Sequence, residues 1–313
     1  MTTPLTVSLV LGSGGARGLA HIGVIRWLES NGFTVRSVAG TSMGALVGGI
    51  YAAGELDAFE RWARALRQTD VLRLLDIAWH PSGLFKGERV IETLKGLIGA
   101  RNIEDLPITF TAVATDVEAE KEVWLNRGPL FDAIRASIAV PTVFTPFEIN
   151  GRWLLDGGLV NPMPIAPTLS DGTDLTIAVD LAGPRESVPA IRAAMAPVTA
   201  PAEPTDVLAG YQRRIIAFID EVQTKLGVQP QPSGHQPAGQ WGLGDVIQGS
   251  FETMQGIVSR FKLAAYTPDA IVTIPRDAAR AFEFHRAEEL IDRGWREAGQ
   301  ALSHLIAVSP RSE

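Results

Sequence analysis

The chain has 313 residues, of which 46% are hydrophobic, and its 35 acidic and 28 basic side chains give a net charge of −7 at pH 7. A chain of this length can bury a large core, and an acidic chain without a Lys/Arg-rich run argues against nucleic acid as a partner. The absence of cysteine excludes disulfides, thiolate metal sites and a cysteine nucleophile. No basic stretch precedes the first apolar residues and no apolar run reaches about 18 residues, so we expect a cytoplasmic protein without a signal peptide or a membrane span.

Segments with strand and helix patterns alternate along the first half of the chain, which predicts an α/β fold with a largely parallel sheet. The helical run that starts near residue 16 has a stop signal at Gly32, and Asn150-Gly151 is the strongest short hairpin signal. In chain order we expect a strand at 6–11, a helix at 16–32, a strand at 34–40, a helix at 43–54, strands at 108–116 and 121–126, a hairpin at 145–158, strands at 174–182 and 269–275, and a helix at 286–305.

Residues 184–244 interrupt this alternation, because they are rich in Pro, Gly, Ala and Gln, a composition typical of flexible or extended connections. Within them, residues 206–227 carry apolar side chains at steps of three and four, which predicts an amphipathic helix. This helix could act as a lid over an apolar site, contact a membrane, form a dimer seam or pack on its own core. We therefore predict one domain made of 1–183 and 245–313, with 184–244 as an insertion.

The pattern G-x-S-x-G occurs once between a predicted strand and a predicted helix, with Ser42 at its centre. Strand, turn and helix are the setting of a nucleophile elbow, in which the serine has a strained backbone. Bulky residues two positions before and after it would clash, and Gly40 and Gly44 remove that clash because they lack Cβ. The alternative interpretation of Ser42 is a structural turn in a glycine-rich chain.

A second glycine cluster follows the first predicted strand and opens the first predicted helix. Backbone N–H groups at such a place can hold a pyrophosphate or a developing oxyanion. The dinucleotide motif G-x-G-x-x-G is not met, because position 17 is Arg and the last glycine, Gly18, comes one residue late. The second strand also leads into Ser42 rather than into an acidic residue that could bind a ribose. No Gly-Lys-Ser/Thr ends the glycine run, so a P-loop is excluded as well.

A serine nucleophile needs a proton acceptor, and none of the five histidines has the sequence context of a catalytic one; they are His21, His80, His235, His285 and His304. His21 lies in a predicted helix, where a hydrogen-bonded structural histidine is the usual case. Asp156 is a better candidate, because it ends a predicted strand and precedes Gly157-Gly158, which allow a sharp bend and a close approach. The alternative for this segment is an ordinary Asp-Gly turn.

Three motifs in this order, GSGGARGLAHIGV (12–24), GTSMG (40–44) and DGG (156–158), resemble the bacterial patatin-like phospholipases. The branch that they resemble includes the lysophospholipases of the neuropathy-target-esterase (NTE) type. The connecting blocks at 83–94, 114–116, 128–147 and 284–302 are similar to that family too, so the resemblance covers residues 5–182 and 245–305. It implies a three-layer α/β/α fold with a mostly parallel central sheet, in which 1–183 and 245–313 form the catalytic domain.

The resemblance also implies roles for individual residues. Ser42 and Asp156 would form a two-residue catalytic dyad, which needs no histidine. The backbone N–H groups of the oxyanion hole would come from Gly14, Gly15, Ala16 and Arg17. The supporting glycines of the loop, the elbow and the Asp-Gly-Gly turn would be Gly12, Gly18, Gly40, Gly44, Gly157 and Gly158. Two departures stand out: position 13 is Ser where many relatives have Gly, and no glycine turn follows residue 116.

The implied activity is hydrolysis of fatty-acyl esters of phospholipids, lysophospholipids or related lipids through an acyl-serine intermediate, without a metal or an organic cofactor. The expected partners are a lipid or acyl-ester substrate and a membrane surface in peripheral contact. The sequence does not fix the oligomeric state. Two alternatives remain open: an acyltransferase that uses the same site, and a non-catalytic lipid-binding regulatory protein. Retention of Ser42, Asp156 and the glycine loop counts against the second alternative.

Overall fold

The computed structural model describes residues 4–74, 77–80, 83–186 and 243–306. The chain divides into two compact units, and the larger one consists of residues 1–187 and 254–313. The smaller unit, 188–253, is described only over 243–253, which form the first half of a helix, α8 (Leu243–Ala265). The amphipathic helix predicted at 206–227 lies outside the described residues, so its role stays a prediction. The rest of this description concerns the larger unit.

Within the described residues, the main sheet has eight strands; seven follow the order β11-β10-β1-β2-β5-β9-β8, and β6 pairs with β5. Neighbouring strands from β11 to β5 are parallel, whereas β6, β8 and β9 join by antiparallel pairs. The strands of this sheet are β1 (Thr6–Leu11), β2 (Thr34–Thr41), β5 (Thr109–Asp116), β6 (Lys121–Leu125), β8 (Phe147–Ile149), β9 (Arg152–Asp156), β10 (Leu175–Gly183) and β11 (Ala270–Pro275). A smaller sheet contains β3 (Ile77–His80), β4 (Gly83–Phe85) and β7 (Thr142–Phe144).

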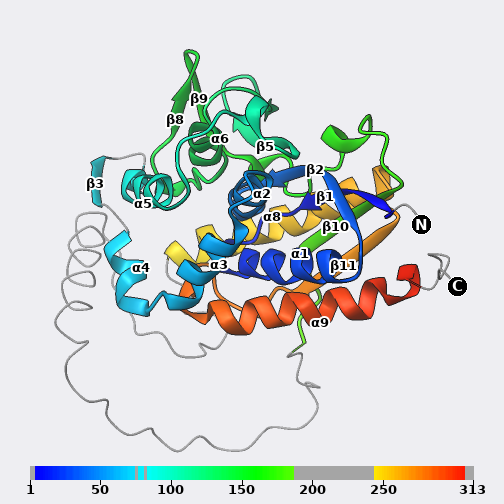
Figure 1. Ribbon diagram of the computed structural model, residues 1–313. Helices are drawn as coiled ribbons and strands as arrows, with labels where there is room; N and C mark the ends of the chain where they lie inside the picture. The colour runs from blue at the N-terminus through cyan, green and yellow to red at the C-terminus, as the bar shows by residue number, and fades with distance from the viewer. Residues whose placement is uncertain (1–3, 75–76, 81–82, 187–242, 307–313) are drawn as a thin grey trace, which may run out of the picture. The chain divides into compact units, whose positions relative to one another are not determined.

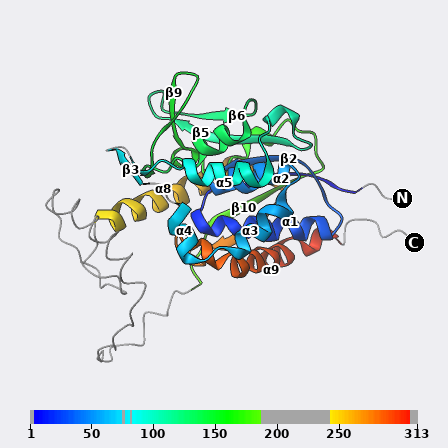
Figure 2. The same cartoon turned by 60° about the vertical axis from the view of Figure 1, so that its left-hand side comes forward.

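Helices accompany these strands along the chain. The α-helices of the described residues, besides α8, are α1 (Ala20–Ser30), α2 (Met43–Ala52), α3 (Leu56–Ala65), α4 (Gln68–Leu74), α5 (Glu88–Ile98), α6 (Leu130–Ser137) and α9 (Ala287–Ile306). Short 3-10 helices are η1 (Gly15–Leu19), η2 (Ile103–Asp105), η3 (Gly157–Leu159), η4 (Ala166–Thr168) and η5 (Phe284–Arg286). Figures 1 and 2 both show α1 and α9 side by side along the sheet.

Alternating side chains of β1 divide the interior into two layers. Leu9 and Leu11 belong to the large apolar cluster that includes the buried faces of α1, α2 and α9. Val10 points to the opposite face and packs with Met163 near η4, against Leu263 of α8. Because helices cover both faces of a mostly parallel sheet, the structure confirms the predicted three-layer α/β/α fold.

Most predicted elements are present. The hairpin turns at Asn150 and Gly151, whose φ values of 52° and 74° fit a tight two-residue turn. The helix predicted from residue 16 begins as the 3-10 helix η1 and becomes α-helical only at Ala20, since the glycines next to residue 16 favour an irregular start. The sequence pattern did not predict the helices α3, α4, α5, α6 and α8 or the short strands of the smaller sheet.

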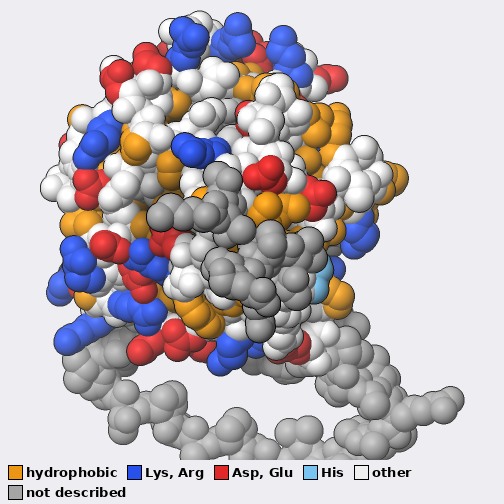
Figure 3. Space-filling model, turned by 45° about the vertical axis from the view of Figure 1, so that its right-hand side comes forward, with side chains coloured by type: hydrophobic (Ala, Val, Ile, Leu, Met, Phe, Trp, Pro, Cys, Tyr) orange, Lys and Arg blue, Asp and Glu red, His pale blue; other side chains and the backbone are white. Residues whose placement is uncertain are grey.

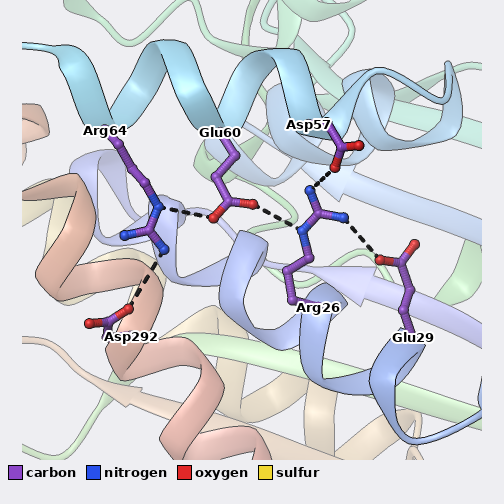
Figure 4. A network of polar contacts seen from close by, with 6 residues as sticks. All are labelled: Arg26, Glu29, Asp57, Glu60, Arg64 and Asp292. Carbon is purple, nitrogen blue, oxygen red and sulfur yellow. Dashed lines mark hydrogen bonds and ion pairs between the residues drawn. The ribbon is translucent and has the colours of Figure 1, made fainter.

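An ion-pair network joins three helices on one face of the larger unit (Figure 4). Arg26 of α1 donates to Glu60 of α3 at 2.9 Å, and Arg64 of α3 donates to the other oxygen of Glu60 at 3.0 Å. Arg64 also pairs with Asp292 of α9 at 3.6 Å, and Arg26 pairs with further carboxylates on α1 and α3, namely Glu29 and Asp57. Glu60 is the junction, because it binds both arginines and its side chain is only 17% exposed.

Replacing Glu60 with Gln should lower the free energy of unfolding by about 1 kcal/mol, because two partly buried ion pairs are lost at once. The loss should shrink in 1 M NaCl, where the Debye length falls to about 3 Å. Urea unfolding of wild type and variant at low and high salt measures both values. Glu92→Gln is the control, because Glu92 pairs with Lys95 alone among the described residues and its side chain is 69% exposed. Equal losses in the two variants would argue against a cooperative network.

The surface of the described residues mixes hydrophobic, acidic and basic side chains, as the face drawn in Figure 3 shows. Large apolar side chains are exposed on several elements, and Phe261 of α8 has the highest exposed fraction among them, 71%. None of the described helices combines the length and the hydropathy that a bilayer crossing requires.

Candidate active site

Ser42 lies on a sharp turn between β2 and α2, as the sequence pattern predicted. Its φ of 57° lies in the left-handed region that non-glycine residues rarely adopt. A Cβ added to Gly44 would lie 2.0 Å from the carbonyl oxygen of Leu11, and one added to Gly40 would lie 2.3 Å from that of Gly44. The neighbouring backbone lies too close for a side chain at either position, so both must be glycine. The strained serine at the start of a helix has the geometry of a nucleophile elbow.

A serine on α6 holds this turn in place. The backbone N–H of Ser42 donates to Oγ of Ser137 at 2.9 Å, and Ser137 Oγ donates to the carbonyl oxygen of Val113 at 2.6 Å. The hydroxyl of Thr41 donates to the carbonyl oxygen of Asn161 at 2.9 Å. The sequence gives no signal for Ser137, because it lies 95 residues from its partner. Together these buried bonds fix the strained backbone from both sides.

Asp156 ends β9, and its side chain is fully buried. The backbone N–H of Gly158 donates to Oδ1 at 2.7 Å, whereas Oδ2 has no hydrogen-bond partner among the described residues. Burial raises the pKa of Asp156 to about 7, and the Ser42 hydroxyl and the Gly158 amide, which favour the charged form, oppose that rise. A carboxyl group with this pKa can gain and lose a proton near neutral pH.

The Asp-Gly-Gly turn and the elbow lie next to each other. A Cβ added to Gly157 would lie 2.1 Å from the carbonyl oxygen of Val113 and 3.0 Å from Cγ2 of Thr41. The Ser42 hydroxyl is also close enough to Asp156 to lower the pKa of its carboxyl group. The structure thus brings together Ser42 and Asp156, which are far apart in the sequence.

The glycine loop runs along the same edge of the sheet. A Cβ added to Gly18 would lie 2.4 Å from Cβ of Met43, so the loop lies against the start of α2. Of the four predicted oxyanion-hole residues, Ala16 already donates its N–H to the carbonyl oxygen of Ala281 at 2.9 Å. Arg17 belongs to η1, and its Nε donates to the carbonyl oxygen of Gly14 at 3.0 Å. In the described part of the chain, the N–H groups of Gly14 and Gly15 have no acceptor.

The loop is anchored at its first two residues. The N–H of Gly12 donates to the carbonyl oxygen of Val179 at 3.1 Å, and that of Ser13 to the carbonyl oxygen of Pro162 at 2.9 Å. His21 is fully buried under it and bonds through Nε2 to the carbonyl oxygen of Gly12 at 2.9 Å. Burial lowers the pKa of His21 to about 4, so this histidine is neutral and supports the loop.

Two other histidines, His285 and His304, are exposed. His80 lies in β3, and His235 lies outside the described residues. Among the described residues, no group of three or more His, Asp and Glu side chains could hold a metal ion. Asp156 is the carboxyl group that lies beside Ser42.

Comparison with known proteins identifies the family of the chain. The sequence profile of the patatin-like phospholipase family matches residues 9–169, which include the glycine loop, the elbow and the Asp-Gly-Gly turn. An NTE family protein of Mycobacterium tuberculosis is 42% identical over 328 residues, covering 95% of this chain and 91% of that protein. A lysophospholipase of the NTE group from Saccharomyces cerevisiae is 32% identical over 188 residues, covering 58% of this chain and 11% of that protein.

Among solved structures, VipD from Legionella pneumophila aligns over 93% of this chain and 67% of its own, with 13% sequence identity and a TM-score of 0.39. That likeness is too weak to support an argument. The profile match over half of the chain and the similarity to the mycobacterial protein are sufficient to assign the family. The chain belongs to the patatin-like phospholipase family, a family of lipid hydrolases.

Proposed function

We propose that this protein hydrolyses fatty-acyl esters of lysophospholipids or phospholipids, with Ser42 as nucleophile and Asp156 as its proton acceptor. The observation that carries the proposal is the pair itself: a serine on a strained elbow beside a buried carboxyl group whose Oδ2 has no hydrogen-bond partner among the residues that the structure describes. A direct serine–carboxylate pair needs no histidine, and buried His21 is a weak base, because its pKa is lowered to about 4 and its Nε2 binds the carbonyl oxygen of Gly12.

In the first half of the reaction, Oδ2 of Asp156 accepts the hydroxyl proton while Oγ of Ser42 bonds to the ester carbonyl carbon. The N–H groups of Gly14 and Gly15 stabilise the oxyanion that forms, and each such donor contributes about 3 kcal/mol in other acyl-transfer enzymes. The ester C–O bond then breaks, and the leaving alcohol takes the proton from Asp156. In the second half, water attacks the acyl-Ser42 carbonyl carbon, Asp156 accepts the water proton and returns it to Ser42, and the fatty acid leaves.

The choice of substrate rests on relatives. The yeast relative is named a lysophospholipase, and the family is named for phospholipid hydrolysis. A single-chain lysophospholipid is therefore the first substrate to test. The acyltransferase alternative uses the same acyl-Ser42 but passes the acyl group to a different acceptor, so the nature of the product separates the two functions.

The test is incubation of the purified chain with lysophosphatidylcholine, with the released fatty acid measured by mass spectrometry. Acid quenching during turnover should trap an acyl group on the peptide that contains Ser42. Adding glycerol as an acceptor should leave free fatty acid as the main product. Acyl-glycerol as the main product would instead support the acyltransferase, and binding of the lipid without any product or acyl-peptide would support the regulatory alternative.

A further inference from the structure

The part of α8 that belongs to the larger unit has an unusual distribution of polarity. Its buried side chains are polar or small: Gln255 is 7% exposed and Ser259 is 3% exposed. Three of its exposed side chains are large and apolar, Met254, Ile257 and Phe261, and Arg260 is exposed beside them. A surface helix ordinarily buries its apolar side and exposes its polar side. Gln255 is therefore buried for a reason other than apolar packing, and its contacts show what that reason is.

The side-chain amide of Gln255 contacts two loops of the candidate active site at once. Its Nε2 donates to Oγ of Ser13, in the glycine loop, at 3.0 Å. A Cβ added to Gly158, in the Asp-Gly-Gly turn, would lie 2.1 Å from this Nε2 and 2.9 Å from Oγ of Ser13. The amide therefore lies directly against the turn that orients Asp156.

Each of the two loops presents a group that the proposed reaction uses. Ser13 directly precedes Gly14 and Gly15, so its hydrogen bond to Gln255 restrains the position of their N–H groups. On the other side, Gly158 donates to Oδ1 of Asp156 at 2.7 Å, and this Oδ1 lies 2.9 Å from the position of a Gly158 Cβ. The amide of Gln255 thus lies within the range of about 4–6 Å over which a charge shifts a carboxyl pKa.

We propose that Gln255 and Ser13 form a positioning pair, which fixes the glycine-loop donors relative to the Asp-Gly-Gly turn and keeps an uncharged group beside Asp156. The inference rests on the proposed function and adds to it a pair of residues that the family profile match, 9–169, only half contains. It also assigns a partner to Ser13, at the position where many relatives have glycine. Displacement of catalytic donors by even 1 Å lowers rates by about a hundredfold, so a restraint at this point affects turnover.

The first test is a double-mutant cycle with a soluble short-chain p-nitrophenyl ester. Gln255→Ala and Ser13→Gly should each lower kcat by about 5- to 20-fold with KM changed less than about twofold, because the contact acts on transition-state donors. The double variant should be no slower than the slower single variant, since both remove one bond. Ile257→Ala, on the outward side of the same helix, is the matched control and should have wild-type kinetics.

The second test introduces a negative charge at position 255 and measures the pH dependence of activity, which a purely structural role of Gln255 would leave unchanged. Gln255→Glu should move the acidic limb of the kcat/KM profile upward by about one pH unit, because a carboxylate near Asp156 raises the pKa of that group. If Gln255→Ala does not fold, Ser13→Gly alone still tests the contact.

Two results would overturn this inference and leave the proposed function intact, provided that turnover depends on Ser42. One is that the losses in the two single variants add in the double variant. The other is that the Gln255 and Ser13 variants have wild-type kinetics. A wild type without Ser42-dependent turnover would overturn the proposed function and this inference with it.

Discussion

Ser42→Ala is expected to lower kcat/KM for fatty-acyl ester hydrolysis by about three to five orders of magnitude, because the nucleophile is removed from a site whose other parts act through it. Asp156→Asn should cause a loss of similar size, because an amide oxygen cannot take the hydroxyl proton. Asn keeps an oxygen that can accept the hydrogen bond of Gly158, so the turn is preserved. Hydrolysis of a p-nitrophenyl ester by the purified variants, with folding checked by circular dichroism, measures both losses.

The controls are chosen to match the environment of each residue. Ser37→Ala removes another buried hydroxyl from β2, on the strand that leads to the elbow. Asp174→Asn removes a carboxylate at the opposite edge of the sheet, where it accepts from Thr6. Both controls should retain activity within about twofold of the wild type. Full activity in Ser42→Ala would remove the elbow from the mechanism.

The raised pKa of Asp156 predicts opposite effects of pH on activity and on stability. Below about pH 7 the carboxyl group is protonated in the folded protein and cannot act as a base, so kcat/KM should fall about tenfold per pH unit on the acidic side. In the unfolded chain the same group ionises at its ordinary pKa of about 3.8. Between these two values the folded state holds a proton that the unfolded state has lost. The contribution of this group to stability is therefore fully present below about pH 4 and is lost as the pH rises to about 7.

Asp156→Asn removes this linkage, because its amide does not ionise. Its advantage in free energy of unfolding over the wild type should grow by about 2–3 kcal/mol between pH 5 and pH 8.5. Urea unfolding at the two pH values measures the change. Asp174→Asn should show no change over this interval, because the pKa of Asp174 is lowered and lies below it. An advantage of Asp156→Asn that is independent of pH would mean that Asp156 has an ordinary pKa in the folded protein.

The sequence was sufficient to predict the parts of the candidate site whose chemistry is local. Ser42 is identified by glycines two positions away on each side, and Asp156 by the two glycines that follow it, so a short motif contains the whole signal. Ser137 and Gln255 could not be predicted, because their partners lie 95 and 242 residues away. For Gln255 the ordinary rule would also mislead, since it places apolar side chains inside, whereas α8 buries Gln255 and Ser259 and exposes Met254, Ile257 and Phe261.

The same limit applies to the fold. The long parallel strands have apolar runs that predict them, and the hairpin at Asn150-Gly151 is specified by its own two turn residues. The strands of the smaller sheet are only three or four residues long, too short for a period to be recognised. Which N–H groups of the glycine loop remain without an acceptor also depends on a distant carbonyl, that of Ala281, which no local pattern indicates.

The sheet topology bears on when the candidate site can form during synthesis. β1 is the earliest of the described strands in chain order, yet it pairs with β10, and Thr6 binds Asp174, 168 residues later. The glycine loop and the elbow are made early, the carboxyl group follows at 156, and the amide that joins the two loops arrives only at 255. Because contacts so distant along the chain close late in folding, the nascent polypeptide carries a serine without its acceptor and its loop supports. The site is therefore assembled only after residue 255 has been made.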